Sequence, residues 1–346
     1  MAVQTVLGKI NPSELGIVLT HEHVVLDRAP ATVEPEEIGA RNLFHSKLTM
    51  DKLGIVKRNP LAILDNLQIM DENSQVEELM QFKYAGGKTV VDVTSGGVGR
   101  DPQLLRRVAL KTGLNIIAGA GYYIESFLPK SVLSRTVAEL EEEIIKQVTV
   151  GFDHTDIIAG VIGEIGVSRV MTPFEENSLT ASCRAHARTG VPLSIHVNPW
   201  APAAFEAMEV IEAHSADPEK VTICHVDLVT DEDFLIRLLD KGVFLEFDNF
   251  SREVTRDLKH CTPEVGRFLP DWDVLRMIKK LIDRGYGRQI LLSMDICLKH
   301  MLRAYGGVGY AHVIANLVPM MKELGITQAQ IDEILIHNPA RWLNVK

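Results

Sequence analysis

Six polar side chains of the metal-binding type stand at the ends of short apolar segments in this sequence. The first segment ends in Thr20-His21-Glu22-His23, and strand side chains alternate with a period of two, so His21 and His23 would point the same way. Two imidazoles on one face form half of a transition-metal site. An ordinary surface strand could carry the same pattern, so the pair needs support from the rest of the chain.

Four further ionisable residues close later apolar segments. Glu164 stands between glycines in GVIGEIG, His196 follows PLSI, His225 follows VTIC, and Asp295 follows QILLSM. Burying four imidazoles and two carboxylates together without a partner would be very costly. A pair of divalent metal ions would offset that cost, and this donor set suits Zn, Mn, Fe or Co. The sequence therefore predicts a two-metal site in which one carboxylate bridges both ions.

Short β-branched segments alternate along the chain with amphipathic segments of helical period, such as 101–113 and 273–285. Eight such segments predict strands that are buried on both faces. Eight repeats favour the α/β class and a closed (β/α)8 TIM barrel, whose active site lies at the C-terminal ends of the strands. The predicted strands are Ile17–His23, Lys88–Ser95, Asn115–Gly121, Gly160–Gly166, Pro192–Val197, Val221–His225, Val243–Phe247 and Gln289–Met294.

One connection departs from this alternation. About fifty residues separate the first predicted strand from the helical pattern near Ser74, and a connection of that length is usually functional or lid-like. No low-complexity tract or Pro/Gly/Ser-rich linker divides the chain. We therefore predict that residues 1–346 form a single domain with a long insertion after the first strand.

Composition and charge exclude several classes of protein. The 346 residues are 46% hydrophobic and 24% charged, which is typical of globular proteins and excludes disordered and fibrous chains. A net charge of −10 disfavours binding to a phosphate backbone. Four cysteines without a CxxC pair predict no disulfide framework, and neither a signal peptide nor a bilayer-spanning segment is visible. We expect a cytoplasmic protein that acts on a small molecule rather than on nucleic acid or a membrane.

Beyond these patterns, the sequence resembles the phosphotriesterase family of the amidohydrolase superfamily over nearly its whole length. The matching motifs include VQTVLGKINPSELGIVLTHEHVVLD, IIAGAGYY, GVIGEIG, LLSMDI and IHNPARWL. Many members place a carboxylated lysine on the fourth strand to bridge two metals. Glu164 stands at that position here, so the resemblance is to a Glu-bridged GEIG branch, and this departure makes phosphotriester hydrolysis a less direct expectation.

The resemblance implies a role for each matching residue. A hydroxide that bridges two ions, expected to be Zn, would attack the carbonyl of a lactone, carboxylic ester or N-acyl amide, and Asp295 would pass the proton to the leaving group. Hydrolysis of organophosphate triesters at the same site and a non-catalytic metal-binding protein are the alternatives. The family also implies a homodimer and no organic cofactor. The more buried metal would be held by His21, His23, Glu164 and Asp295, and the more exposed one by Glu164, His196 and His225.

Residues around the expected metals have two possible roles each. Tyr123 matches a family tyrosine that hydrogen-bonds near the metals, and packing at the rim is its alternative role. Basic residues in the loops after strands one, seven and eight would suit an anionic substrate, although solvated charges or ion pairs would explain each one singly. Cys224 and Cys297 are expected to be packing residues that point away from the site. The expected substrate-binding residues are Arg28, Asn249, Arg252, Lys299 and Arg303.

Overall fold

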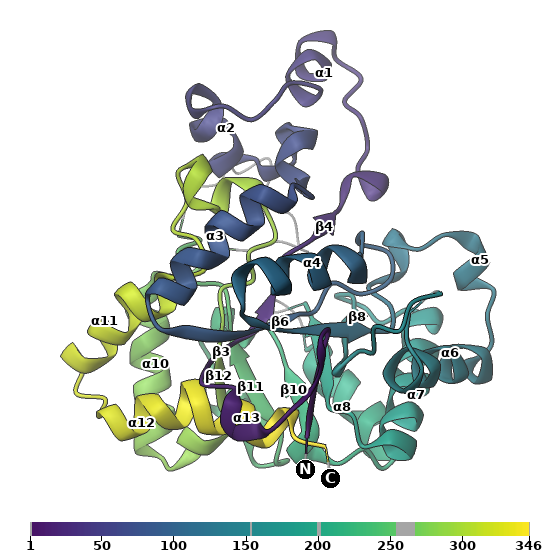
Figure 1. Cartoon of the computed structure of the whole chain (residues 1–346), viewed down its shortest axis with the longest axis vertical. Helices are drawn as coiled ribbons and strands as arrows, with labels where there is room; N and C mark the ends of the chain where they lie inside the picture. The colour runs from purple at the N-terminus through teal and green to yellow at the C-terminus, as the bar shows by residue number, and fades with distance from the viewer. Residues whose placement is uncertain (1, 153, 199–201, 254–266, 346) are drawn as a thin grey trace.

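Eight parallel strands form a barrel at the centre of the protein (Figure 1). The computed structural model describes residues 2–152, 154–198, 202–253 and 267–345. The strands follow one another around the barrel in chain order, and each predicted segment overlaps one of them. The (β/α)8 barrel is thereby confirmed. The barrel strands are Ile17–Glu22 (β3), Gly87–Asp92 (β6), Asn115–Ala120 (β7), Val161–Val167 (β8), Leu193–Val197 (β9), Val221–Ile223 (β10), Phe244–Phe247 (β11) and Ile290–Leu292 (β12).

The first and last barrel strands meet through a few hydrogen bonds rather than a full ladder. The backbone N–H of Asp295 donates to the carbonyl of His21 at 3.1 Å. The backbone N–H of His21 in turn donates to the hydroxyl of Ser293 at 3.0 Å. These bonds tie the end of β3 to the end of β12, so residues from opposite ends of the sequence become neighbours at the C-terminal mouth of the barrel.

Helices surround the barrel and begin and end where local sequence signals place them. The helix α4 (Pro102–Thr112) has the Asp101 side chain as its N-cap and ends at Gly113, which adopts a left-handed φ of 67°. Its Leu104, Leu105 and Val108 side chains are buried against the barrel. The other outer helices are Glu72–Tyr84 (α3), Val137–Thr149 (α6), Pro173–Thr189 (α7), Ala203–Ala213 (α8), Glu232–Leu239 (α9), Asp271–Asp283 (α10), Val318–Glu323 (α11), Gln328–Asp332 (α12) and Asn338–Leu343 (α13).

The long connection after β3 forms an insertion that projects from the barrel at the top of Figure 1. It contains α1 (Ile38–Phe44) and α2 (Leu53–Arg58), and the short strands Leu26–Asp27 (β4) and Gln68–Ile69 (β5) pair at its base. A small apolar cluster of its own, with Val56 and Ile63 at its centre, stabilises it. Because the insertion follows the C-terminal end of β3, it stands beside the mouth of the barrel.

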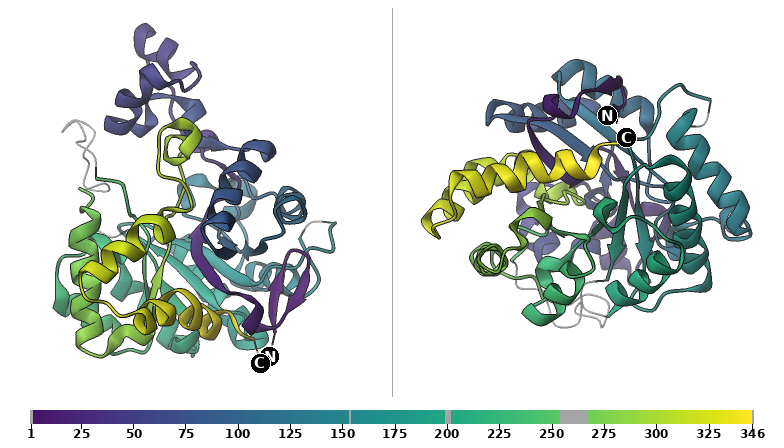
Figure 2. Two further views of the ribbon diagram at one scale, coloured as in Figure 1. Left: turned by 60° about the vertical axis from the view of Figure 1, so that its left-hand side comes forward. Right: turned by 90° about the horizontal axis from the view of Figure 1, so that it is seen from below.

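The two termini close the opposite end of the barrel, where they lie side by side (Figure 2). An N-terminal hairpin pairs Val3–Thr5 (β1) with Gly8–Ile10 (β2), and Ala2 exchanges backbone hydrogen bonds with Val345. The Trp342 side chain of α13 is fully buried beneath the strands. None of the helices in the described part of the chain is long and apolar enough to cross a membrane.

Candidate metal centre

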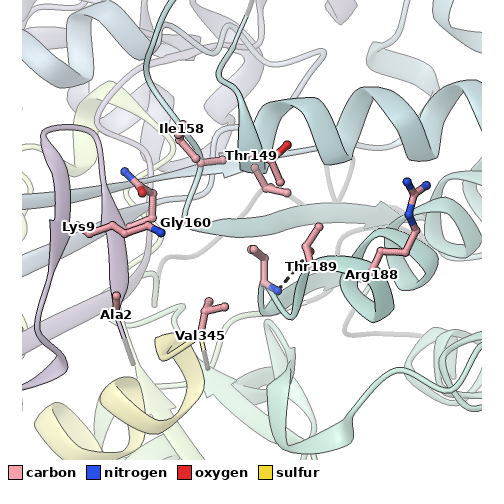
Figure 3. A pocket seen from close by; sticks show the side chains of 12 residues that line it. Ala2, Lys9, Thr149, Ile158, Gly160, Arg188, Thr189 and Val345 are labelled. Carbon is pink, nitrogen blue, oxygen red and sulfur yellow. Dashed lines mark hydrogen bonds between the residues drawn. The ribbon is translucent and has the colours of Figure 1, made fainter.

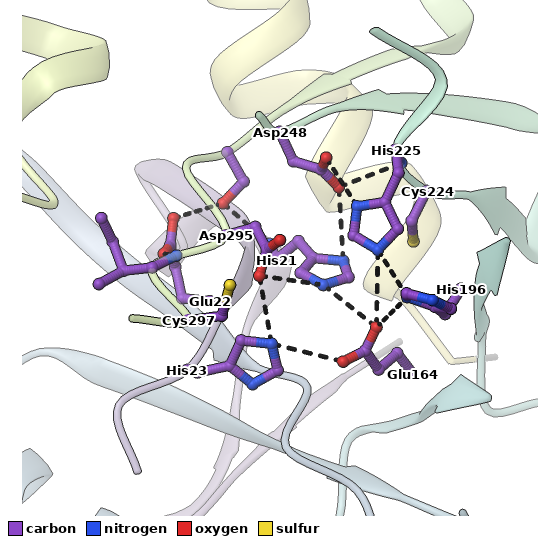
Figure 4. Close-up of polar contacts among 12 residues, drawn as sticks. His21, Glu22, His23, Glu164, His196, Cys224, His225, Asp248, Asp295 and Cys297 are labelled. Carbon is purple, nitrogen blue, oxygen red and sulfur yellow. Dashed lines mark hydrogen bonds and ion pairs between the residues drawn. The ribbon is translucent and has the colours of Figure 1, made fainter. Parts of the chain in front are cut away.

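The six expected metal ligands converge at the C-terminal mouth of the barrel (Figure 4). Glu164 lies at their centre, and its two carboxylate oxygens face all four imidazoles. Its Oε1 is 3.4 Å from His23 Nε2, and its Oε2 is 3.5 Å from His21 Nε2. The same Oε2 lies 3.0 Å from His196 Nδ1 and 3.7 Å from His225 Nε2. A carboxylate in this position can serve both halves of the cluster, as a bridging ligand must.

The glycines on either side of Glu164 allow this close approach. A Cβ atom on Gly163, whose φ is +139°, would lie 2.2 Å from the carbonyl oxygen of Ser194 on the neighbouring strand. A Cβ on Gly166 would lie 2.2 Å from the backbone nitrogen of Ile124. The GEIG motif therefore lets β8 fit tightly between β9 and the segment after β7 while Glu164 points into the barrel.

Asp295 completes the inner half of the cluster from the end of β12. Its Oδ1 lies 3.3 Å from His23 Nε2 and 4.0 Å from His21 Nε2. Asp295 adopts a left-handed φ of 44°, which turns the chain sharply after the strand. Its second oxygen, Oδ2, accepts a hydrogen bond from Arg252 at 2.7 Å. One oxygen thus faces the histidines while the other is held by a guanidinium.

The residues present fit a bound cation. Both ring nitrogens of His21 are buried and have no hydrogen-bond partner, although an isolated buried imidazole would need one. The ligand atoms of His21, His23 and Asp295, and those of His21, Glu164 and His225, lie close enough to hold a metal ion. Imidazole and carboxylate donors together suit a borderline first-row divalent metal.

The electrostatics of the cluster also favours positive charge at its centre. Burial lowers the pKa of His23, but the carboxylates of Asp295 and Glu164 raise it to about 10. Burial likewise lowers the pKa of His225, and the neighbouring Asp248 carboxylate raises it to about 10. The buried carboxylates therefore stabilise a positive charge beside them. In the absence of metal ions, protonated histidines carry that charge.

Tyr123 and Arg28 lie at the edge of the cluster. The Tyr123 hydroxyl is 3.5 Å from His196 Nε2, and its ring contacts the His196 ring edge to face. The Arg28 guanidinium lies over the ring of Phe127, which packs against Tyr123. The structure therefore gives Tyr123 both of its expected contacts, a polar one and a packing one.

The other expected substrate-binding residues are distributed differently. The buried Asn249 amide donates to Asp227 at 3.0 Å and to Asp248 at 2.7 Å, so its donors are used within the protein. Lys299 forms an ion pair with Asp65 of the insertion at 2.9 Å. Arg303 has an exposed side chain, and its backbone N–H donates to Glu78. Among the described contacts, neither Lys299 nor Arg303 joins the six clustered side chains.

The expected direction of Cys224 is wrong. Its Sγ donates to Glu246 Oε2 at 3.3 Å and lies beside His21, so it points into the barrel rather than away. The strand β10 ends at Ile223, and His225 adopts a left-handed φ of 62°. Alternation stops at that turn, and both neighbours face inward. Cys297 also lies near the site, because Arg252 donates to its Sγ at 3.3 Å.

Sequence reasoning missed the residues behind the histidines. Asp248 Oδ1 lies 2.9 Å from His225 Nδ1, and Thr94 Oγ1 lies 2.8 Å from His23 Nδ1. Glu246 lies behind His21. The sequence does hold one signal, because an acidic residue inside the apolar segment VFLEF is unusual in a buried strand.

A cavity of about 180 Å³ opens beside the cluster, between the insertion and the segments after β11 and β12. Phe250 and Leu298 supply apolar walls, and the charged residues of the lining are Lys57, Arg252 and Glu253. Because Arg252 also bonds Asp295, this cavity adjoins the candidate metal centre.

A second cavity, of about 560 Å³, lies at the opposite end of the barrel between the N-terminal hairpin and the ends of α6 and α7 (Figure 3). Its Arg188 is paired with Glu141 and Glu142. None of the six clustered residues lines it.

Known proteins resemble the chain over almost its full length. A model of the phosphotriesterase family matches residues 1–343. An N-acetyltaurine hydrolase from Xenopus tropicalis is 37% identical over 350 residues, which cover 99% of this chain and 98% of the relative. A phosphotriesterase-related protein from Nematostella vectensis is 36% identical with the same coverage. The crystal structure of a resiniferatoxin-binding protein from Rhodobacter sphaeroides superimposes with a TM-score of 0.94 at 34% identity, covering 99% of this chain and 95% of that one.

Proposed function

Because the chain belongs to the phosphotriesterase family, we propose that it is a hydrolase that depends on two divalent metal ions, expected to be Zn, and cleaves a carboxylic carbonyl substrate. The substrate class is an N-acyl amide, a carboxylic ester or a lactone. The observation that carries the proposal is His21, whose two ring nitrogens are buried without a hydrogen-bond partner among the clustered donors. Such an arrangement is costly unless a cation binds there.

In this proposal the clustered residues form two groups of ligands. Both groups share Glu164, whose oxygens face histidines on each side. Bound divalent ions would activate a water molecule at neutral pH and polarise the substrate carbonyl. The inner ion would be held by His21, His23, Glu164 and Asp295, and the outer ion by Glu164, His196 and His225.

Asp295 and Tyr123 have roles that follow from their own contacts. Arg252 keeps the Asp295 carboxylate ionised, so Asp295 can accept a proton from the attacking water. The same positive charge makes Asp295 a weak base, which helps it pass the proton on to the leaving nitrogen or oxygen. Tyr123 keeps its phenolic proton, because burial raises its pKa well above the ordinary value, and it can donate a hydrogen bond beside His196.

An anionic group on the substrate is supported by the charges near the cluster. Arg28, Arg252 and Lys57 supply positive charge near the cluster of a protein whose net charge is −10. Arg252 is paired with Asp295, and Glu253 also lines the cavity. Arg28 and Lys57 are therefore the cations with charge to offer a substrate. The N-acetyltaurine hydrolase that is 37% identical acts, by its name, on an amide of this kind. We therefore place N-acyl amino acids and N-acyl aminosulfonates first among the candidate substrates.

A substrate panel tests the proposal. The purified protein is stripped with a chelator, reloaded with Zn²⁺ or Mn²⁺, and assayed on N-acyl taurines, N-acyl amino acids, lactones and aryl phosphotriesters. We expect metal-dependent hydrolysis of an N-acyl compound. Turnover of the phosphotriester alone would overturn the assignment. The non-catalytic alternative has one observation in its favour, the similarity to a resiniferatoxin-binding protein. A protein that binds metal but hydrolyses no compound of the panel would support that alternative.

A further inference from the structure

The strand β11 and the residue that follows it supply none of the expected metal ligands, yet they direct two carboxylates, Glu246 and Asp248, into the barrel. Glu246 and Asp248 are two residues apart, so their side chains point to the same side of the extended chain. Both are fully buried. Carboxylates are rarely buried without a partner, since ionised groups lose much hydration there. Each of these two lies behind one clustered histidine.

Asp248 shows what such a carboxylate does. Its Oδ1 lies 2.9 Å from His225 Nδ1, and its Oδ2 accepts the backbone N–H of His225 at 3.3 Å (Figure 4). With Nδ1 bound to Asp248, His225 presents Nε2 to the cluster. The carboxylate thus selects which ring nitrogen is free for a metal.

Glu246 stands in the matching position behind His21. Its Oε2 lies 3.5 Å from His21 Nδ1 and accepts the thiol proton of Cys224 at 3.3 Å. The opposite side of the ring, His21 Nε2, faces Glu164 at 3.5 Å. His21 Nδ1 is buried without a hydrogen-bond partner, and the nearest carboxylate oxygen is Glu246 Oε2 at 3.5 Å. The second oxygen of that carboxylate, Oε1, is also buried without a partner, so Glu246 has unused capacity to accept a proton.

We propose that Glu246 is a positioning residue that accepts the Nδ1 proton of His21 and so fixes the ring with Nε2 directed at the inner metal. This inference rests on the proposed metal-dependent function and adds a residue to it. Carboxylates behind metal-bound histidines fix the tautomer and raise the basicity of the ligand. Cys224, which directly follows the neighbouring strand β10, donates its thiol proton to the Glu246 carboxylate and so helps to hold it in place.

A third cation below the ring of His21 is the competing explanation. His21 Nδ1, Cys224 Sγ, Glu246 and Asp248 offer ligand atoms that lie within 4.8 Å of one another. The contacts favour a positioning role, because both Asp248 oxygens already bond His225. A cation there would also require His21 to bind metal through both nitrogens at once.

The test compares metal affinity in Glu246→Leu, Glu246→Gln and the control Glu78→Leu. Glu78 is a buried carboxylate that accepts the backbone N–H groups of Arg303 and Ala304, away from the clustered histidines. Competition with a chromogenic chelator gives the Kd for Zn²⁺, elemental analysis gives ions per chain, and thermal unfolding of the metal-free proteins gives Tm.

We expect Glu246→Leu to raise the Kd for Zn²⁺ by about 10- to 100-fold. The Kd of Glu246→Gln should lie between those of Glu246→Leu and the unaltered protein. The number of ions bound at saturation should be the same in all three proteins. In the metal-free protein, Glu246→Leu leaves the buried donors of Cys224 and His21 without an acceptor, so its Tm measures that structural cost separately from the Kd. Glu78→Leu should lower the metal-free Tm and leave the Kd unchanged.

Three results would overturn the inference. The first is Zn²⁺ affinity in both Glu246 variants within twofold of the unaltered protein. The second is an equal loss of affinity in Glu78→Leu. The third is the loss of one whole ion per chain from an initial three. An unaltered protein that binds no metal would refute the proposed function together with this inference, whereas metal binding that depends on Glu246 without any hydrolysis would refute the proposed function alone.

Discussion

Arg252 holds one oxygen of Asp295 while the other oxygen faces the histidines. Its Nη2 donates to Asp295 Oδ2 at 2.7 Å and also to the Asp295 backbone carbonyl, and Oδ1 lies 3.3 Å from His23 Nε2. The two residues are separated by 43 positions in the sequence and come from the segments after β11 and β12. The guanidinium therefore orients the Asp295 carboxylate, which is expected to bind metal and transfer protons, and keeps it ionised.

Replacing Arg252 should shift the acid limb of the pH–rate profile. Burial alone would raise the pKa of Asp295, but the Arg252 charge, with His23, holds it well below the ordinary value. In Arg252→Gln the pKa of Asp295 rises, so Asp295 becomes protonated at a higher pH. The acid limb of the profile should therefore lie about 1 pH unit higher than in the unaltered protein. The check is log(kcat) against pH with saturating metal. If the KM for anionic substrates rises while the acid limb stays at the same pH, Arg252 binds substrate and does not control the ionisation of Asp295.

Removing the metal should lower stability as well as activity. A ligand that binds the folded state at a concentration one hundred times its Kd contributes about 2.7 kcal/mol to the free energy of unfolding. Treatment with a chelator should therefore lower Tm, and Zn²⁺ should restore both Tm and turnover. In His21→Ala the chelator should change Tm much less, because the inner ion no longer binds. An identical chelator effect in both proteins would contradict the assignment of His21 as a ligand.

Removing the Tyr123 hydroxyl should slow turnover modestly. The hydroxyl lies 3.5 Å from His196 Nε2, and one neutral hydrogen bond contributes about 0.5–1.5 kcal/mol. Tyr123→Phe should thus lower kcat by roughly 2- to 10-fold and leave metal content unchanged. An unchanged kcat would leave only ring packing against His196 and Phe127 as the role of Tyr123.

Asp65 should stabilise the attachment of the insertion in a pH-dependent manner. Burial raises the pKa of Asp65, but ion pairs with Lys47 and Lys299 lower it to about 2. Because the folded pKa lies below the ordinary value, the stabilisation is complete above about pH 4 and is lost as the pH falls towards 2. Asp65→Asn should cost about 1 kcal/mol at pH 7, after allowance for solvent screening. Urea unfolding at pH 7 and pH 3 gives the free energy of unfolding of both proteins. The difference between Asp65→Asn and the unaltered protein should be smaller at pH 3 than at pH 7, and an equal difference at both pH values would contradict the ion-pair explanation.

The sequence alone determined the barrel and the residues at its mouth. Each predicted strand overlaps a barrel strand, because short apolar segments and helical periodicity are local properties of the chain. The residues His21, His23, Glu164, His196, His225 and Asp295 could be chosen because strand ends can be located in sequence, and parallel strands of a closed barrel bring those ends together. Their roles as metal ligands stay predictions that the experiments above address.

Only the tertiary structure decided what surrounds these residues. The contact between Arg252 and Asp295, the position of Glu246 behind His21, and the pairing of Lys299 with Asp65 join segments that no local pattern connects. Alternation also failed at Cys224, because a left-handed residue follows the short strand β10. Side-chain direction beyond a strand end depends on the turn that follows and on long-range packing, so the periodicity of the sequence does not determine it.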